Sequence, residues 1–457
     1  MISVLNHQLR SSGSSFILVV AFLCCVSCST TSSSTARPTV IKKDEVAKST
    51  SKDIETVEVD TISWSWADRE TFPPIVTNGE VASYLLDKVE KDRYEIALLL
   101  PLTLHQVVPT LDKNNKKFAD FYEGMKMAAS HAKDLNAHVT VYYTNKDEAA
   151  LDDIFASWNF RKPDLIIASS IRSLIQKTAT YGMNNRIPVI SPWLSSTRVA
   201  EDNVFYLQMR PSIEEYYKVI LGHLDAHFEH DEIRVLQKSD GSDNTLVRVL
   251  RRLQEEISDL PIIKPYETVD IEVDSLMDSE ANVFDTLLVQ DVKAFVIPNY
   301  RQSDDRYIYT CLRKMYGERL GRDFTVYTMP IAIKSDRVDI NILKNLDLKT
   351  PEFRFPDMSK SEVREFRESY LSQHGRLPSE DAFYGYDMMS FISHGLANYG
   401  QYFHYFMAGE ELDLMQMKVH ISPFYKEDNK GRPDFMTNDH LYIIEYIEDH
   451  FEVSDRL

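Results

Sequence analysis

Short apolar runs alternate with amphipathic helical patterns along most of this chain, and this alternation restricts the possible fold more than any other feature of the sequence. The runs are mostly β-branched or aliphatic, which is typical of strands covered on both faces of a parallel sheet. Between them, apolar residues recur at helical spacing, as they do from Phe118 to Ala132. Strands that alternate with helices predict βαβ units and doubly wound sheets. The runs are Ile96–Leu100, Val139–Tyr143, Leu165–Ala168 and Pro188–Ser191, then Ile233–Gln237, Ile262–Ile263, Ala294–Pro298 and Thr325–Met329.

The apolar runs form two series along the 457 residues, and a chain of this length is expected to contain more than one domain. We therefore predict an α/β fold with two similar lobes, each built on a doubly wound parallel sheet. Lobe 1 is expected to comprise 94–209 and about 330–457, and lobe 2 is expected to comprise 210–329. Further helices are predicted near 360–374 and 381–400, and a final hairpin is predicted from Leu441–Tyr446 and Phe451–Val453.

The N-terminal region has the features of an export signal. Phe16–Cys25 is an apolar run too short to cross a bilayer, which requires about 20 apolar residues, and it suits the hydrophobic part of a secretory signal. Small residues and Cys28 follow, and this pattern resembles the lipobox at which bacterial lipoproteins are cleaved and diacylated. The resemblance implies a signal peptide over 1–27 and a lipid on Cys28. An ordinary signal peptide or an uncleaved anchor is the alternative.

Two segments separate this signal from the predicted lobes. Residues 28–60 are rich in Ser, Thr, Lys and acidic residues and contain almost nothing that could form a core, so we expect a disordered tether there. Residues 61–93 contain Trp64, Trp66 and an apolar pattern at helical spacing. That composition favours a strap packed on the main body over a partner-binding segment.

Charge and cysteine content exclude several classes of protein. The formal net charge of −19 argues against nucleic-acid binding, which needs clustered Lys and Arg. The four cysteines are Cys24, Cys25, Cys28 and Cys311, and only the last lies beyond the N-terminal region, so no disulfide framework is expected. Cys311 falls in a helical pattern and is expected to be buried and unreactive.

The sequence also lacks the usual signatures of catalysis. It contains no P-loop, GxSxG, HExxH or CxxC motif. His223 and His227 share a helix face at metal-ligand spacing, but a charged, solvent-exposed helix end is the favoured interpretation. We therefore expect no enzymatic activity, no catalytic residue, no cofactor and no metal site.

Several segments together resemble a known family. Ile96–Pro101 and Phe121–Met125 are similar to the first βα unit of type 1 periplasmic binding proteins of the Leu/Ile/Val-binding kind. Ser195–Thr197 stands where that family has a ligand loop of small residues, and Gly385–Asp387 resembles its late Gly-Tyr-Asp motif. The pattern covers roughly 94–456. It is similar to a Bacteroidota lipoprotein subgroup related to LysM-associated solute-binding-like proteins, although no LysM repeat occurs here.

Candidate ligand contacts follow from the strand ends, because ligands of open α/β sheets bind outside the carboxyl ends of the strands. Hydroxyl groups and helix N-termini at such positions suit a carboxylate, with N-capping and simple turn formation as alternatives. Asp240 and Asp243 could bind an ammonium group, but solvated loop positions are favoured for both, and Trp193 is expected to pack. The candidates are Ser169, Ser170, Ser195, Ser196 and Thr197 from lobe 1, and Asn299 and Tyr300 from lobe 2.

The resemblance implies a periplasmic protein held by lipid to the inner or outer membrane. It would capture a small polar solute, such as an amino acid, a peptide or a cell-wall fragment, between its lobes for transport or sensing. An ABC transporter in the inner membrane would then be its partner, with no nucleic acid involved. The alternative is an envelope interaction protein that regulates or scaffolds the cell-wall synthesis machinery, with a cell-wall synthase as its partner.

Overall fold

The fold is described here from a computed structural model of the chain. The predicted signal peptide over 1–27, the tether over 28–60 and most of the strap over 61–93 lie outside the described residues. All the described residues belong to one compact unit, Glu58–Leu457, and no helix among them is long and apolar enough to cross a membrane. The described residues are 61–64, 88–102, 113–132, 135–157, 160, 162–257, 264–278, 280–289, 291–426 and 433–454.

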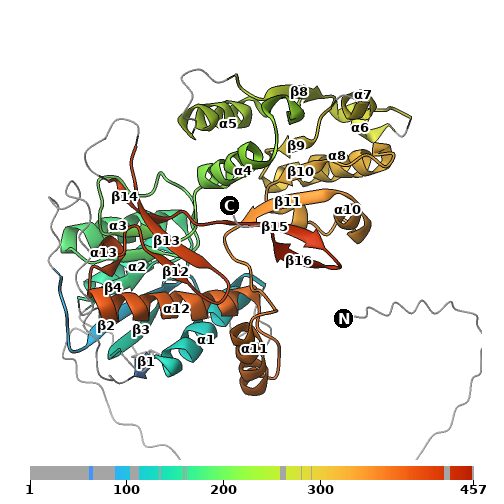
Figure 1. The fold of residues 1–457 in the computed structure, drawn as a ribbon. Coiled ribbons are helices and arrows are strands. Elements are labelled where there is room, and N and C mark those ends of the chain that lie inside the picture. Colours follow the sequence, from blue (N-terminus) through green and yellow to red (C-terminus); the bar gives the residue numbers. More distant parts are fainter. Residues whose placement is uncertain are drawn as a thin grey trace, which may run out of the picture. The chain divides into compact units, whose positions relative to one another are not determined.

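Lobe 1 is built on a nine-stranded sheet with the order β1-β3-β2-β4-β5-β6-β14-β13-β12 (Figure 1). The strands from β3 to β14 in this order pair in parallel, and β1, β13 and β12 add antiparallel pairs at the two edges. The strands are β1 (Thr61–Trp64), β2 (Tyr94–Leu100), β3 (Ala137–Tyr143), β4 (Leu165–Ile167), β5 (Val189–Ser191), β6 (Tyr206–Gln208), β12 (Glu411–Asp413), β13 (Lys418–Phe424) and β14 (Phe435–Asn438). The helices of this lobe are α1 (Lys113–His131), α2 (Glu148–Ala156), α3 (Arg172–Asn185), α11 (Ser361–His374), α12 (Glu380–Tyr399) and α13 (Phe403–Phe406).

Lobe 2 is built on a seven-stranded sheet with the order β16-β15-β11-β10-β9-β7-β8. Its strands from β11 to β8 are parallel, and the hairpin of β15 and β16 adds antiparallel to β11. The strands are β7 (Ile233–Lys238), β8 (Glu267–Ile271), β9 (Ala294–Ile297), β10 (Thr325–Thr328), β11 (Asp347–Glu352), β15 (Tyr442–Ile447) and β16 (His450–Val453). The helices are α4 (Ile213–His227), η2 (His230–Glu232), α5 (Asn244–Ile257), α6 (Val273–Met277), α7 (Asp285–Val289), η3 (Gln302–Asp304), α8 (Asp305–Glu318), α9 (Ile331–Lys334) and α10 (Ile340–Asn345).

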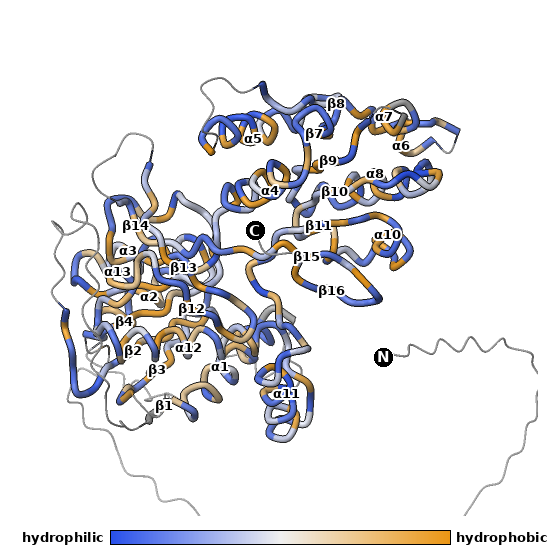
Figure 2. Tube along the Cα trace, viewed as in Figure 1, coloured by the Kyte–Doolittle hydropathy of each residue, from blue (hydrophilic) through white to orange (hydrophobic). Residues whose placement is uncertain are grey.

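The predicted α/β class and the two parallel sheets are confirmed. The most apolar runs form central strands: Ile96–Leu100 lies in β2 and Ala294–Pro298 covers β9, and both strands are buried. Figure 2 shows the hydrophobic residues gathered on the sheets and on the helix faces that cover them. The predicted run Ile262–Ile263 lies outside the described residues. Strand β8 follows it, at more polar residues that the sequence pattern did not indicate.

The chain passes between the two sheets three times, at 209–212, 353–360 and 439–441. The second and third passages differ from the predicted lobe boundaries, because residues after about 330 were all assigned to lobe 1. Strand β11 instead pairs with β10, and the final hairpin pairs with β11, so both belong to the sheet of lobe 2. The polar residues of β11, such as Asp347 and Lys349, hid this strand from the apolar pattern.

Helices α1 and α12 meet at two glycines. Gly124 belongs to the segment Phe121–Met125, and Gly385 belongs to the Gly-Tyr-Asp motif. A Cβ on Gly124 would stand 1.9 Å from the carbonyl oxygen of Ala382, and one on Gly385 would stand 1.8 Å from that of Phe121. Both distances are shorter than any tolerable contact, so only glycine allows the two backbones to approach this closely. These motif residues therefore serve helix packing.

Candidate ligand-binding site

Ser169 provides a buried hydroxyl at the carboxyl end of β4. Its side chain is 0% exposed, and its Oγ has no hydrogen-bond partner among the described residues. Helix α3 begins just beyond it, with Ile171 at the N-cap and no side-chain hydrogen bond to the cap. The alternative that Ser169 or Ser170 caps this helix is therefore not realised. A buried hydroxyl without a partner costs about 1–3 kcal/mol, so this position favours a bound polar group.

The loop of Ser195, Ser196 and Thr197 lies against the first turns of α3. The side chains of Arg172 and Gln176 donate to the carbonyl oxygen of Arg198 at 3.2 and 3.4 Å. All three hydroxyl residues are partly exposed, and Ser196 Oγ accepts a long hydrogen bond, 3.4 Å, from the Arg198 amide. Ser169 and Ser170 directly precede the same helix, so the five predicted residues of lobe 1 all lie near the start of α3.

Trp193 forms an aromatic wall beside this loop. Its ring lies 5.3 Å from that of Phe118 and 4.8 Å from that of Phe121, and the Phe121 ring lies 5.6 Å from that of Tyr384. The indole thus packs on two rings of α1, one of which is supported by Tyr384 of α12, and the prediction that Trp193 packs is confirmed. The wall is rigid because its rings are fixed by helix packing.

Asn299 and Asp243 form a buried network at the strand ends of lobe 2. Asn299 is 0% exposed, and its Nδ2 donates to Asp243 Oδ1 at 2.8 Å, while its Oδ1 has no partner among the described residues. Asp243 also accepts from the Lys238 amide at 2.9 Å, and Lys238 Nζ reaches Asp304 Oδ1 at 2.6 Å. The prediction that Asp243 is a solvated loop residue was therefore wrong. Its carboxylate is buried and accepts a hydrogen bond from the backbone at the end of β7.

The other two candidates of this region are more exposed. Asp240 is exposed and accepts a 2.8 Å hydrogen bond from the Ser242 amide, which agrees with the predicted solvated position. Tyr300 is partly buried, and the Arg301 guanidinium lies 5.7 Å from the centre of its ring. Tyr300 can therefore present a ring face and a hydroxyl at the edge of the sheet.

Asp387 of the Gly-Tyr-Asp motif binds the backbone amides of a neighbouring loop. It is 0% exposed, and its carboxylate accepts from the amides of Met415, Gln416 and Met417 at 2.9, 2.8 and 3.2 Å. The Gln416 carbonyl in turn accepts from the Phe355 amide at 2.6 Å, which ties the second passage to the same loop. Asp387 therefore fixes the loop of residues 415–417, to which the second passage is hydrogen-bonded through Phe355.

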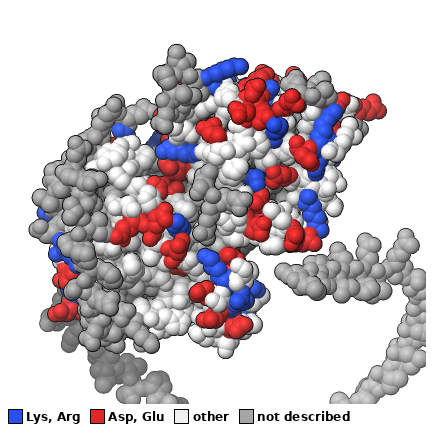
Figure 3. All heavy atoms as spheres, viewed as in Figure 1, with Lys and Arg blue, Asp and Glu red and all other residues white. Residues whose placement is uncertain are grey.

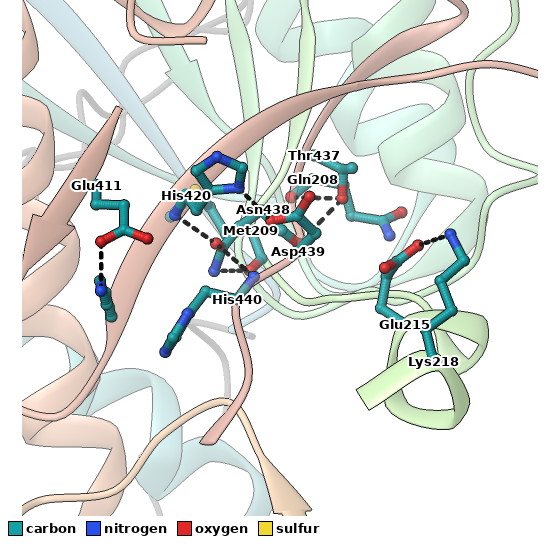
Figure 4. A network of polar contacts seen from close by, with 11 residues as sticks. Gln208, Met209, Glu215, Lys218, Glu411, His420, Thr437, Asn438, Asp439 and His440 are labelled. Atoms are coloured by element: carbon teal, nitrogen blue, oxygen red, sulfur yellow. Dashed lines mark hydrogen bonds and ion pairs between the residues drawn. The ribbon is translucent and has the colours of Figure 1, made fainter. Parts of the chain in front are cut away.

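A second polar network joins the first and third passages (Figure 4). Asn438 Nδ2 donates to the Met209 carbonyl at 3.3 Å, and its Oδ1 accepts from the His420 amide at 3.0 Å. The His420 ring Nδ1 lies 2.7 Å from Asp439 Oδ1. The two strands that leave lobe 1 are thus held side by side, which is the arrangement a hinge between two lobes requires.

Two residues that the sequence interpretation missed stand at the starts of passages. Arg210 follows β6, and its guanidinium lies 5.6 Å from the Phe353 ring. Arg354 follows β11, and its guanidinium lies 4.8 Å from the Phe353 ring and 4.6 Å from the Tyr384 ring. The position of Arg210 just after Gln208 and Met209 was the available signal, whereas Arg354 could not be found while β11 was unrecognised.

Among the described residues, no three His, Cys, Asp or Glu side chains are placed to hold a metal ion. His223 is 1% exposed, so the predicted exposed helix end is wrong for this residue, and its Nδ1 lies 2.6 Å from the Tyr327 hydroxyl. Cys311 is buried as predicted, and burial raises the pKa of its thiol to about 12.

Two surface pockets, of about 650 and 440 Å³, lie on lobe 2. The larger is lined by α10 and the turn between β15 and β16, and the smaller by β7 and α5. Neither contains any of the seven predicted ligand-binding residues, so the candidate site remains at the strand ends.

Comparison with solved structures agrees with this architecture. A putative branched-chain amino acid ABC transporter protein from Rhodospirillum rubrum superposes with a TM-score of 0.55 at 12% identity, covering 79% of this chain and 100% of that chain. The fold is that of type 1 periplasmic binding proteins. An ABC transporter substrate-binding protein from Desulfitobacterium hafniense in complex with Leu gives 0.50 at 14% identity, with coverage of 79% and 100%. One from Sphaerobacter thermophilus gives 0.50 at 12% identity, with coverage of 80% and 98%. No family model and no curated protein matches the sequence.

Proposed function

We propose that this chain is a solute-binding protein that captures a small polar ligand between its two lobes, for transport or sensing. The buried Ser169 hydroxyl carries this proposal, because it has no hydrogen-bond partner among the described residues and lies just before the start of α3. A ligand carboxylate could accept hydrogen bonds from both this hydroxyl and the first amides of the helix. Ser195, Ser196 and Thr197 add further donors from the neighbouring loop.

The fold supports this proposal, and it provides the motion that capture requires. Three chain passages and the Asn438 network join the lobes, so closure would be a hinge movement about these strands. Structural neighbours are named as ABC transporter substrate-binding proteins, and one is a complex with Leu. An ABC transporter as partner and the absence of enzymatic activity belong to the same proposal.

The location of the protein is part of the proposal too. The apolar run before Cys28 supports export and lipid attachment, which would hold the two lobes at a membrane surface in the periplasm. The chain would then meet its solute outside the cytoplasm.

A thermal-shift screen of the full-length chain tests solute capture. The compounds are amino acids, short peptides, sugars and muropeptide fragments. A compound present at 100 times its dissociation constant should stabilise the fold by about 2.7 kcal/mol, and this stabilisation should be lost when Ser196 and Thr197 are both replaced by Ala. The control replaces Ser130 and Thr180, two exposed helix hydroxyl residues, by Ala and should keep the full shift. If no compound shifts the melting temperature, solute capture is contradicted.

A further inference from the structure

Two arginines lie over the same aromatic ring, where the first and second passages leave the sheets. Arg210 follows β6 in lobe 1 and Arg354 follows β11 in lobe 2, and both guanidinium groups stack on the ring of Phe353. This chain has a net charge of −19, and Figure 3 shows acidic and basic side chains interspersed over the visible face.

Arg354 is held firmly but is only loosely neutralised. Its guanidinium lies against the rings of Phe353 and Tyr384, and its side chain is 17% exposed. The nearest carboxylates, those of Asp381 and Glu380, stand at 3.6 and 4.0 Å, which is beyond hydrogen-bond length. Its buried Nη1 forms this ion pair with Asp381 but has no hydrogen-bond partner among the described residues. A buried arginine nitrogen in this state favours an additional acceptor.

Arg210 is exposed and acts on the Tyr216 hydroxyl, and no ion pair between it and a carboxylate occurs among the described residues. It lies beside Tyr216: burial raises the pKa of Tyr216 to about 12, and Arg210 acts on it in the opposite direction. An arginine positioned by rings and a hydroxyl, with its charge unpaired, is arranged to meet an anion from outside.

The arginines are continuous with the candidate ligand loop of lobe 1. The Tyr384 ring that supports Arg354 also lies 5.6 Å from the Phe121 ring, and the Tyr384 hydroxyl donates to the carbonyl oxygen of Pro192. Pro192 immediately precedes Trp193 and the loop of Ser195–Thr197. One connected set of rings therefore joins the arginine pair to the hydroxyl loop.

The acidic groups nearby are already used within the protein. Lys238 neutralises Asp243 and Asp304 at the strand ends of lobe 2, at 3.5 and 2.6 Å. Lys334 pairs with the buried Glu352 at 2.5 Å, next to Phe353. A ligand ammonium group would have to displace one of these lysines, or Arg354 from Asp381 and Glu380. A ligand carboxylate would instead meet the exposed Arg210 and the Nη1 of Arg354.

We propose that Arg210 and Arg354 form an anion subsite and that the solute is an organic acid without an ammonium group. This rests on the proposed capture of a solute between the lobes. The acid group would lie against both guanidinium groups, and the rest of the solute would lie along the aromatic wall and the hydroxyl loop. The class of ligand is thereby a carboxylate anion, distinct from a zwitterionic amino acid.

Calorimetric titration of the full-length chain tests this assignment. The probes are succinate, citrate and benzoate as anions, and leucine, glutamate and lysine as amino acids. We expect at least one of the three anions to bind more tightly than every amino acid, with an affinity that falls as salt is added. Arg210→Gln should weaken that binding at least tenfold.

Two further variants control the test. Arg354→Lys keeps the charge but loses the planar fork, so it should weaken the anion at least tenfold while the melting temperature reports whether the variant folds. Arg313→Gln removes another exposed arginine, which lies 5.9 Å from the Tyr309 ring on α8, and should leave binding unchanged. Tight binding of an amino acid that Arg210→Gln does not alter would overturn the anion subsite and leave solute capture standing. Failure of every probe, and of the wider screen, would contradict both.

Discussion

Gly385 of α12 lies directly against the backbone of Phe121 in α1, so that a Cβ on this glycine would stand 1.8 Å from the Phe121 carbonyl oxygen. We predict that Gly385→Ala lowers the free energy of unfolding by about 3 kcal/mol or prevents folding. The Phe121 backbone cannot move away from the added Cβ as a flexible side chain could. Urea denaturation measures the change. Gly222→Ala on α4 is the matched control: nothing lies within 4 Å of its Cβ position, so this variant should be neutral or more stable by up to about 1 kcal/mol.

The three amides bound by Asp387 give a second prediction. Asp387→Ala leaves the amides of Met415, Gln416 and Met417 without their acceptor in a buried place, so the free energy of unfolding should fall by about 3 kcal/mol. Asp240→Ala removes an exposed carboxylate and should cost less than about 1 kcal/mol. Equal urea midpoints for the two variants would contradict the structural role of Asp387.

A buried histidine predicts a dependence of stability on pH. His404 is 0% exposed, its Nε2 lies 2.9 Å from the Val204 carbonyl, and burial lowers its pKa to about 4. The unfolded chain takes up this proton near pH 6.5 and the folded chain only near pH 4, so stability is full above pH 6.5 and falls as the pH drops towards 4. Between pH 7 and pH 5 the loss from this group is about 2 kcal/mol.

Urea denaturation at both pH values checks this effect. His404→Gln should flatten the difference between pH 7 and pH 5 by that amount, even though the variant is less stable at both. His223, whose pKa burial also lowers to about 4, contributes in the same direction and remains in the variant. An unchanged pH dependence in His404→Gln would show that this histidine is not the source.

Replacing Ser169 should affect ligand binding and stability differently. Ser169→Ala should leave the unliganded protein equally stable or slightly more stable, because the hydroxyl has no hydrogen-bond partner among the described residues, and should reduce solute affinity about tenfold. Thr178→Val removes a buried hydroxyl that donates to the Leu174 carbonyl at 2.7 Å, so it should cost about 1 kcal/mol of stability and leave affinity unchanged. The opposite pattern in melting temperature and titration would contradict the role given to Ser169.

The apolar pattern was sufficient to predict the central strands, because a strand buried on both faces must be apolar throughout, as in Ile96–Leu100. It could not reveal β11, where polar Asp347 and Lys349 alternate with buried residues. That strand and the final hairpin change sheets, so the lobe boundary near 330 was misplaced. Sequence spacing carries no information on which sheet a strand joins when the pairing is long-range, as it is between β11 and β15.

The candidate site was predicted unevenly for a similar reason. Residues that directly follow apolar strands could be selected from the pattern, and the five candidates of lobe 1 lie near the start of α3, where their role in binding stays a prediction. The arginine pair was missed because Arg210 and Arg354 are 144 positions apart and meet only through the ring of Phe353. Asp243 was misread as solvated, since its partners Lys238 and Asn299 become neighbours only in the folded sheet.

The most direct test of solute capture is a calorimetric titration of the most stabilising compound from the screen into the full-length chain. The account predicts one molecule bound per chain, with binding weakened at least tenfold in Ser169→Ala and in the double replacement of Ser196 and Thr197 by Ala. Binding that neither variant alters, or no measurable binding of any compound, would contradict it.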